Sequence, residues 1–350
     1  MPLVSSPLVS VIVPAYNSES TVLATIESVL QQTYQNLELI VIDDGATDGT
    51  VAALQNVADP RLKIFSFANG GLPTARNRGI ERASGQFLSF IDADDLWTTD
   101  KLAKQMRALE DHPKAGGVYS WTLIMDEKGE KFYPGNCEAF EGDVYPHLLL
   151  SNFIGSGSNM LLRREAVESV GNFDVTLDSH EDWDYYLRLS QQWEFAVVPE
   201  PQILYRKTAN SLSSRLPVLE KYILILHERV FSNISPELAH LEAYSMARKY
   251  EFLTQIALTN VSGWSNCTYA LRTLSRAIAH YPKILFTRRT SILIGKLVIS
   301  LALTPRFANR ALVFLLALRS KRYMSKRYIN KPASHISKPK TGQNIQVATP

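Results

Sequence analysis

Acidic side chains gather in three short segments of the chain, and metal binding is the first chemistry to consider. The segment Asp92-Ala93-Asp94-Asp95 directly follows the apolar run Phe87–Ile91. Carboxylates two positions apart on an extended chain face the same side, and three acids this close repel one another unless a cation lies between them. Hard oxygen ligands select Mg²⁺ or Mn²⁺ rather than zinc. We therefore predict a divalent metal site at Asp92, Asp94 and Asp95, in preference to a purely acidic helix start.

The second acidic segment, Asp43-Asp44-Gly45, follows the apolar run Leu37–Ile42. An Asp at the end of a strand can accept a hydrogen bond from the N–H of a nucleobase or from a ribose hydroxyl. The alternative is that these acids only form a turn and that Thr47 and Asp48 cap the next helix. Capping explains Thr47 and Asp48 but not Asp43, so these residues alone leave nucleotide binding and turn formation evenly balanced.

The third acidic segment is His180-Glu181-Asp182-Trp183-Asp184, at the start of a helix that continues through Tyr186 to Leu189. Burial and neighbouring charge can bring the pKa of a partly enclosed Asp close to neutral, where the group serves as a general base. The segment is therefore a candidate base site. Taken by itself, an acidic helix start remains the simpler interpretation.

Two arginines follow a pair of glycines in another part of the chain. Gly70-Gly71 precede a predicted helix that carries Arg76 and Arg78. Either arginine could meet a phosphate group, whereas solvated arginines on a helix surface are the more common case. We keep Arg76 as a candidate contact for a phosphate.

These segments need a scaffold that brings them together, and the apolar pattern predicts one. Short runs rich in apolar and β-branched residues predict strands of a mostly buried, largely parallel sheet; they are Val9–Val13, Leu37–Ile42 and Phe87–Ile91. Helical periodicity alternates with them, at Val22 to Leu30, from about Pro73 to Ala83, and after an N-cap at Thr98 or Thr99. Strand–helix alternation predicts a doubly wound α/β sheet, whose ligands bind beyond the carboxyl ends of the strands.

Composition limits the class of protein. The 350 residues are 45% hydrophobic and 20% charged, which is typical of a folded protein with a large core. The sequence has no run of 18 apolar residues that would predict a membrane span, and its first residues lack the pattern of a secretory signal. Cys137 and Cys267 cannot build a disulfide framework, which favours a reducing cytoplasm. The motifs of P-loop NTPases, dinucleotide dehydrogenases, serine hydrolases and zinc proteases are missing from the sequence.

The net charge of +3 hides a sharp asymmetry along the chain. Residues 1–251 hold all 34 acids and 21 Lys and Arg, a net charge of −13, whereas residues 252–350 hold 16 Lys and Arg and no acid. Within the basic part, residues 284–330 alternate apolar patches with cations, a pattern of helices that lie on an anionic membrane surface. The alternative is a helical cap packed on the preceding helices. No nucleic-acid module accompanies the charge, so we expect no nucleic-acid partner.

The order of the motifs is more informative than any one of them. A first strand leads into Pro14-Ala15-Tyr16-Asn17, and DDGATDGT, GGLPTARNRGI, FIDADD and HEDWDYYLRL follow. Over about residues 8–215 this order resembles the inverting family 2 glycosyltransferases of the GT-A fold. The resemblance implies transfer of a sugar from a nucleoside diphosphate donor to an acceptor hydroxyl, with inversion at the anomeric carbon. Processive synthases of the family add a QxxRW motif and membrane spans that this sequence lacks, so we expect a non-processive enzyme.

The resemblance also implies a place for the nucleotide. Asp43 or Asp44 would hold the nucleobase, usually uracil, near Pro14 and Tyr16. Positive charge near the diphosphate would come from Arg76 or Arg206.

For the reacting groups, the resemblance implies a DxD pair and a base. Asp92 and Asp94 would form the pair, which contacts the ribose and a Mg²⁺ or Mn²⁺ ion on the diphosphate, with Asp95 sharing the metal. Asp182 would be the catalytic base, and Glu181 its neighbour in the family's ED pair.

Together these interpretations predict a GT-A domain over residues 1–216, a helical extension over 217–283, basic amphipathic helices over 284–330 and a disordered tail over 331–350. The predicted activity is metal-dependent sugar transfer, with a UDP-sugar as the favoured donor, to a lipid-linked or surface-polysaccharide acceptor. The alternative is a catalytically weak scaffold that binds sugar nucleotides at the membrane. A protein partner for the basic part is a third interpretation. We expect a cytoplasmic protein, with peripheral attachment to the inner face of the cell membrane left open.

Overall fold

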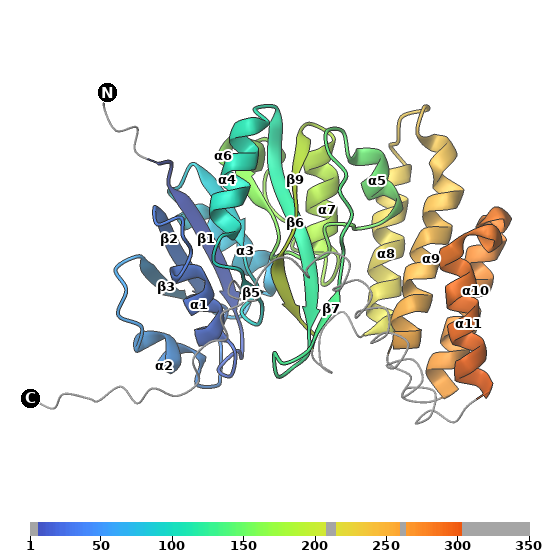
Figure 1. Ribbon diagram of the computed structural model, residues 1–350, viewed down its shortest axis with the longest axis horizontal. Helices are drawn as coiled ribbons and strands as arrows, with labels where there is room; N and C mark the ends of the chain where they lie inside the picture. Colours follow the sequence, from blue (N-terminus) through green and yellow to red (C-terminus); the bar gives the residue numbers. More distant parts are fainter. Residues whose placement is uncertain (1–5, 208–214, 260–263, 303–350) are drawn as a thin grey trace, which may run out of the picture.

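The structure is a computed structural model that describes residues 6–207, 215–259 and 264–302 (Figure 1). Within these residues, nine strands form one mixed sheet in the order β3-β2-β1-β4-β8-β6-β9-β5, with β7 beside β6. The strands are β1 (Val9–Ala15), β2 (Leu37–Asp43), β3 (Leu62–Ser66), β4 (Phe87–Phe90), β5 (Leu96–Trp97), β6 (Ala115–Met125), β7 (Phe132–Pro134), β8 (Leu161–Arg163) and β9 (Glu194–Arg206).

The first half of the sheet is parallel, as predicted. β1 lies between β2 and β4, and all residues of the three strands are buried, which is why their sequences read as continuous apolar runs. Ala15 pairs with Asp43, so the loops that follow β1 and β2 leave the sheet side by side. β3 was not predicted from the sequence, because its residues are only half buried at the sheet edge and its apolar pattern is weak.

The second half of the sheet mixes directions. β8 is antiparallel to both β4 and β6, whereas β9 is parallel to β6. The helices of this part of the chain are α1 (Val22–Leu30), α2 (Thr50–Gln55), α3 (Leu72–Arg82), α4 (Lys101–Asp111), α5 (Tyr145–Leu150), α6 (Arg164–Val170) and α7 (Glu181–Ser190).

The predicted N-cap of α4 was wrong by one or two residues. The helix begins at Lys101, and Asp100 is its N-cap. Thr98 instead precedes the helix: its carbonyl accepts a hydrogen bond from the Lys101 N–H and its hydroxyl donates to Asp100 Oδ1 at 3.0 Å. The buried face that the periodicity predicted, with Leu102, Met106 and Leu109, is confirmed.

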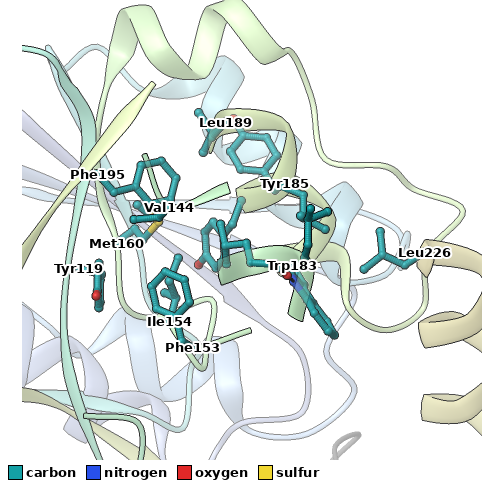
Figure 2. Packing of buried hydrophobic residues seen from close by; sticks show 14 of the residues in the cluster. Tyr119, Val144, Phe153, Ile154, Met160, Trp183, Tyr185, Leu189, Phe195 and Leu226 are labelled. Carbon is teal, nitrogen blue, oxygen red and sulfur yellow. Dashed lines mark hydrogen bonds between the residues drawn. The ribbon is translucent and has the colours of Figure 1, made fainter. Parts of the chain in front are cut away.

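A stack of helices follows the sheet and lies at one end of it (Figure 1). Its members are α8 (Leu216–Phe231), η2 (Ala239–Leu241), α9 (Glu242–Thr259), α10 (Trp264–His280), η3 (Pro282–Phe286) and α11 (Arg288–Ala302). The predicted boundary at residue 216 coincides with the start of α8, yet one buried cluster contains Trp183 of α7 together with Leu226 of α8 and Tyr250 of α9. Figure 2 shows Trp183 on the side of this cluster that faces Leu226. The helices therefore share a core with the sheet domain.

Polar contacts join the two parts as well. Lys249 Nζ and Ser245 Oγ, both on α9, donate to the carbonyl of Leu149 in α5 at 3.0 and 2.6 Å. The predicted amphipathic region is described only as far as residue 302; the rest of it, and the predicted tail over 331–350, lie outside the described residues. Among the described helices, none combines the length and the apolar composition that a membrane span requires.

Candidate active site

The structure separates the roles of Asp43 and Asp44, which the sequence left open. Asp44 is 3% exposed, and its carboxylate accepts hydrogen bonds from the N–H groups of Gly70 and Gly71 and from Arg78 Nη1 at 2.7 Å. Asp44 is therefore used to fix the start of α3. Asp43 Oδ1 accepts from the Ala46 N–H at 2.8 Å, and no described residue donates to its Oδ2. Asp43 is thus the better candidate for a ligand contact.

Pro14 and Tyr16 lie at the end of β1, beside these acids. Pro14 is buried opposite Ile42, whereas the Tyr16 side chain is 52% exposed and accessible to a ligand. The loop after β1 is tied to the loop after β2, because Asn17 Oδ1 accepts a hydrogen bond from the Thr47 N–H at 2.8 Å. The two segments predicted to hold the nucleobase therefore lie side by side.

The acidic segment after β4 folds into a tight turn, in which the Asp95 N–H donates to the Asp92 carbonyl at 3.0 Å. Asp92 keeps a quarter of its side chain exposed, and its Oδ1 accepts a hydrogen bond from Arg76 Nη2. No side chain in the described part of the chain donates to the Asp94 carboxylate. Burial and then the charge of Asp92 raise the pKa of Asp94 to about 6.

Asp95 does not fit the predicted metal role. Its side chain is fully buried, Oδ2 accepts from Ser158 Oγ at 2.5 Å and Oδ1 accepts from the Arg206 N–H at 2.9 Å. Burial, followed by the charges of Asp94 and Asp92, raises its pKa well above the ordinary value. Asp95 therefore fastens the turn to β9, and the predicted metal set reduces to Asp92 and Asp94.

The predicted base lies at the start of α7. Asp182 Oδ1 accepts from the Trp183 N–H at 2.7 Å, and Oδ2 accepts from Asn152 Nδ2 at 3.3 Å. Burial and then the charge of Glu181 raise the pKa of Asp182 to about 7. The indole of Trp183 donates to the Leu148 carbonyl at 2.9 Å and so anchors the first turn of the helix. A carboxyl group that titrates near neutral pH has the property that a general base needs.

The other polar residues of this segment have structural roles. His180 has a left-handed backbone with φ of 63°, and burial followed by the charge of Lys249 lowers its pKa to about 4. It is therefore neutral at pH 7. Asp184 accepts from Arg188 Nε at 2.9 Å and from Arg229 Nη1 at 3.2 Å. Asp182 is the member of the segment that stays available for chemistry.

Arg76 and Arg206, the predicted diphosphate contacts, are both engaged by groups of the chain itself. Arg76 is 1% exposed and forms ion pairs with Asp92 and Glu181, so a diphosphate could reach it only by displacing a carboxylate. Arg206 is also buried, and it donates to the carbonyls of Asp94 and Glu127 at 2.8 and 2.7 Å. Both arginines therefore bind and stabilise the segments that carry the candidate site residues.

The sequence alone assigned no role to the individual polar residues of the segment before β8. Asn152 contacts Asp182, the candidate base, and Ser158 accepts from the Asp92 N–H at 3.0 Å while it donates to Asp95. The run Asn152-Phe153-Ile154-Gly155-Ser156-Gly157-Ser158-Asn159 is rich in Gly, Ser and Asn, which was the available signal for a functional loop.

Oxygen donors are the ligands that Mg²⁺ and Mn²⁺ prefer, and the donor set here fits such an ion only in part. Asp92 and Asp94 are two positions apart in one turn, and burial and then the charge of Asp92 disfavour the ionised form of Asp94, which a bound cation would stabilise. Within the described residues, no group of three His, Cys, Asp or Glu is arranged to hold a metal. A cation at Asp92 and Asp94 would therefore need further oxygen ligands from a donor diphosphate or from water.

Comparison with known proteins gives the family. The model of glycosyl transferase family 2 matches residues 10–171. A Bacillus subtilis protein named "Putative teichuronic acid biosynthesis glycosyltransferase TuaG" is 33% identical over 215 residues, which cover 59% of this chain and 82% of that protein. The chain belongs to glycosyl transferase family 2. An uncharacterized glycosyltransferase of Haemophilus influenzae is 34% identical over 223 residues, or 59% of this chain and 68% of the relative.

The chain spans only about a fifth of the length of some relatives that it matches. A Rickettsia bellii glycosyltransferase is 37% identical, but the match covers 40% of this chain and 20% of that protein. Among solved structures, the mannosyltransferase PcManGT of Pyrobaculum calidifontis, in complex with GDP-Man and Mn²⁺, has a TM-score of 0.55 at 19% identity, covering 92% of this chain and 89% of that one. S. aureus TarS 1–349 has a TM-score of 0.54 at 17% identity, covering 92% of each chain. These likenesses confirm the predicted fold, a GT-A mixed sheet followed by helices.

Proposed function

We propose that this family 2 member is a metal-dependent, inverting, non-processive glycosyltransferase. It moves a sugar from a nucleoside diphosphate donor to a hydroxyl of a lipid-linked or surface-polysaccharide acceptor. The observation that supports this most strongly is that Arg76 forms two ion pairs. Its guanidinium group binds Asp92 of one acidic segment through Nη2 and Glu181 of the other through Nη1. The candidate metal ligands and the candidate base are therefore neighbours.

Each residue then has a task in a single displacement. Asp182 takes the proton of the acceptor hydroxyl, and the hydroxyl oxygen forms a bond to the anomeric carbon as the bond from that carbon to the diphosphate oxygen breaks. Attack from the face opposite the diphosphate inverts the configuration. Asp94 and Asp92 would hold Mg²⁺ or Mn²⁺, which supplies positive charge for the leaving diphosphate. Asn152 orients the carboxylate of Asp182.

The donor and acceptor classes rest on relatives. Solved structures of this fold are described in complex with UDP-GlcNAc and with GDP-Man and Mn²⁺, which supports a nucleotide-sugar donor and a divalent ion. The name of TuaG refers to teichuronic acid biosynthesis, which supports a polysaccharide acceptor. A UDP-sugar is our first candidate for the donor.

The central experiment is calorimetric titration with UDP, GDP and dTDP, with and without Mn²⁺, followed by turnover assays with the sugar donors of whichever nucleotide binds. Metal-dependent binding of one nucleotide together with sugar transfer supports the proposal. Binding without any transfer or donor hydrolysis would favour the alternative, a sugar-nucleotide-binding scaffold. Absence of binding for all three nucleotides would overturn the proposal.

Asp43 and Asp44 provide a test of the nucleobase site. In Asp43→Asn, Oδ1 still accepts from Ala46 while the new amide N–H opposes the N–H of the base, so we expect UDP affinity to fall by about 10-fold or more with little change in Tm. In the matched variant Asp44→Asn, the hydrogen bonds from Gly70, Gly71 and Arg78 lose their charged acceptor and are weakened. We therefore expect a lower Tm as the main effect, with a smaller loss of UDP affinity than in Asp43→Asn. Differential scanning fluorimetry and calorimetry measure both, and the opposite pattern would assign the base contact to Asp44.

One end of the α10–α11 helix pair supports docking to an anionic membrane. Cys267 Sγ of α10 lies 3.8 Å from the Ser300 carbonyl of α11, so Trp264 and Leu301, three residues before Cys267 and one after Ser300, belong to the same end of the helix pair. Trp264 is 59% exposed, Leu301 41% and Val298 58%. The chain beyond residue 302 contributes ten Lys and Arg and no acid. An exposed Trp in a chain that also carries a strongly basic sequence is typical of interfacial binding.

Co-sedimentation with vesicles tests this docking. We expect Trp264→Ser in the full chain to weaken binding to phosphatidylglycerol vesicles by about 10-fold at low salt, and neutral phosphatidylcholine vesicles to bind little in either case. Leu23→Ser is the matched control, because Leu23 is 44% exposed on α1 in the sheet domain. Equal binding of wild type, Trp264→Ser and Leu23→Ser would contradict docking through this end.

A further inference from the structure

Arg76 joins two segments that lie far apart in the sequence. Its Nη2 donates to Asp92 Oδ1 at 2.8 Å, and its Nη1 donates to Glu181 Oε1 at 2.6 Å. These partners are 16 and 105 residues away from Arg76 in the chain. Asp92 belongs to the candidate metal pair, and Glu181 directly precedes the candidate base on α7. One guanidinium group thus contacts the donor side and the acceptor side of the proposed site.

The surroundings hold this group in one position. Arg76 has 1% of its side chain exposed and lies 5.4 Å from the centre of the Phe173 ring. The backbone of Gly157 passes so close that a Cβ atom there would come within 2.1 Å of Arg76 Nη2. The next residue, Ser158, contacts the Asp92 N–H and the Asp95 carboxylate. Glycine at position 157 therefore leaves the space in which the guanidinium bridges the two carboxylates.

We infer that Arg76 is a positioning residue that sets the spacing between the donor-binding turn and the base helix, with Gly157 as the residue that permits its placement. This inference rests on the proposed function. It differs from a role for Arg76 in binding the diphosphate, because the two terminal nitrogens already pair with carboxylates of the chain. Loss of the bridge moves Asp92 and Glu181 relative to one another, and small displacements of reacting groups reduce turnover more than they reduce ground-state binding.

The test compares turnover with binding of UDP and of uridine. We expect Arg76→Gln to lower kcat by about 100-fold while the ratio of UDP to uridine affinity stays within about threefold of wild type. Gly157→Ala, which removes no charged group, should lower kcat by about 10-fold by displacing the guanidinium. Arg82→Gln is the matched control, since Arg82 lies on the same helix and pairs with the exposed Glu81.

A double-mutant cycle separates positioning from general destabilisation. If Arg76 and Glu181 act as a unit, Arg76→Gln combined with Glu181→Gln is no worse than the more damaging single variant. Arg76→Lys, which keeps a cation, should recover part of kcat, and it replaces Arg76→Gln if the latter does not fold. Thermal melting and UDP binding report folding for every variant.

Two results would overturn the inference while leaving the proposed function intact. One is wild-type kcat in folded Arg76→Gln or Gly157→Ala. The other is loss of UDP affinity to the level of uridine with kcat retained, which would make Arg76 a diphosphate contact. If wild type and Arg82→Gln transfer no sugar from any donor that binds, the proposed function itself fails, and the inference fails with it.

Discussion

Replacing Asp182 by Asn should lower kcat of sugar transfer by about 1,000-fold, within the usual range of a lost general base, and leave donor affinity nearly unchanged. Asn has the same shape, so its side-chain oxygen can still accept from the Trp183 N–H while the group can no longer take a proton. Steady-state kinetics with donor and acceptor varied in turn measures the effect. Retention of a tenth or more of wild-type kcat would mean that another group is the base.

The pH dependence of the wild type follows from the same residue. Burial and the Glu181 charge raise the pKa of Asp182 to about 7, and the base is active only when ionised. We therefore expect kcat/KM to rise about tenfold per pH unit below 7 and to level off above it. Asp184→Asn is the matched control two residues away: it loses ion pairs with Arg188 and Arg229, so Tm falls while the pH profile keeps its shape.

Replacing Asp94 by Asn should abolish the response to Mn²⁺ and, in metal-free buffer, raise Tm by a few degrees. Burial and the charge of Asp92 raise the pKa of Asp94 from 3.8 to about 6, so the folded state prefers the protonated carboxyl. The stability gained in this way is present below the unfolded pKa and is lost as pH rises through 6. At pH 7.5 the ionised group therefore costs the fold about 1 to 3 kcal/mol, which Asn removes.

The comparison of Asp94 with Asp100 isolates this effect. Burial opposes ionisation of Asp100 too, but hydrogen bonds from Lys104 and Thr98 lower its pKa, so Asp100→Asn should lower Tm instead of raising it. Mn²⁺ with UDP should raise the Tm of wild type and of Asp100→Asn, and not that of Asp94→Asn. If metal-free Asp94→Asn melts below wild type, the Asp94 carboxylate stabilises the fold, which would contradict its assignment as a metal ligand.

The parts that sequence could predict are those with strong local signals. β1, β2 and β4 are buried throughout, so their apolar runs identify them, whereas β3 at the sheet edge has no such run. The acidic segments were also predictable, because each is a strong local cluster of carboxylates in the sequence. The role of each acid was not predictable, because Asp94 and Asp95 are adjacent residues with the same side chain. Only the turn after β4 and the hydrogen bond from the Arg206 N–H decide that Asp95 points inward.

The role of Arg76 could not be predicted from the sequence either. Helical periodicity predicts that it lies on α3, but its two partners come from β4's loop and from α7, which only the tertiary fold brings together. The predicted phosphate contact was reasonable for an arginine near glycines, and burial of both terminal nitrogens against carboxylates changes its role.

The contact between α9 and α5 has a consequence for protein engineering. Lys249 and Ser245 close the carboxyl end of α5 at Leu149, and Asn152 just beyond it touches Asp182. We expect a chimera that joins the sheet domain of one relative to the helices of another to break this junction and to shift the loop that contacts Asp182, the candidate base. Exchange of acceptor preference between family members should therefore succeed only when residues 145–152 and α9 are taken from the same relative and transferred together.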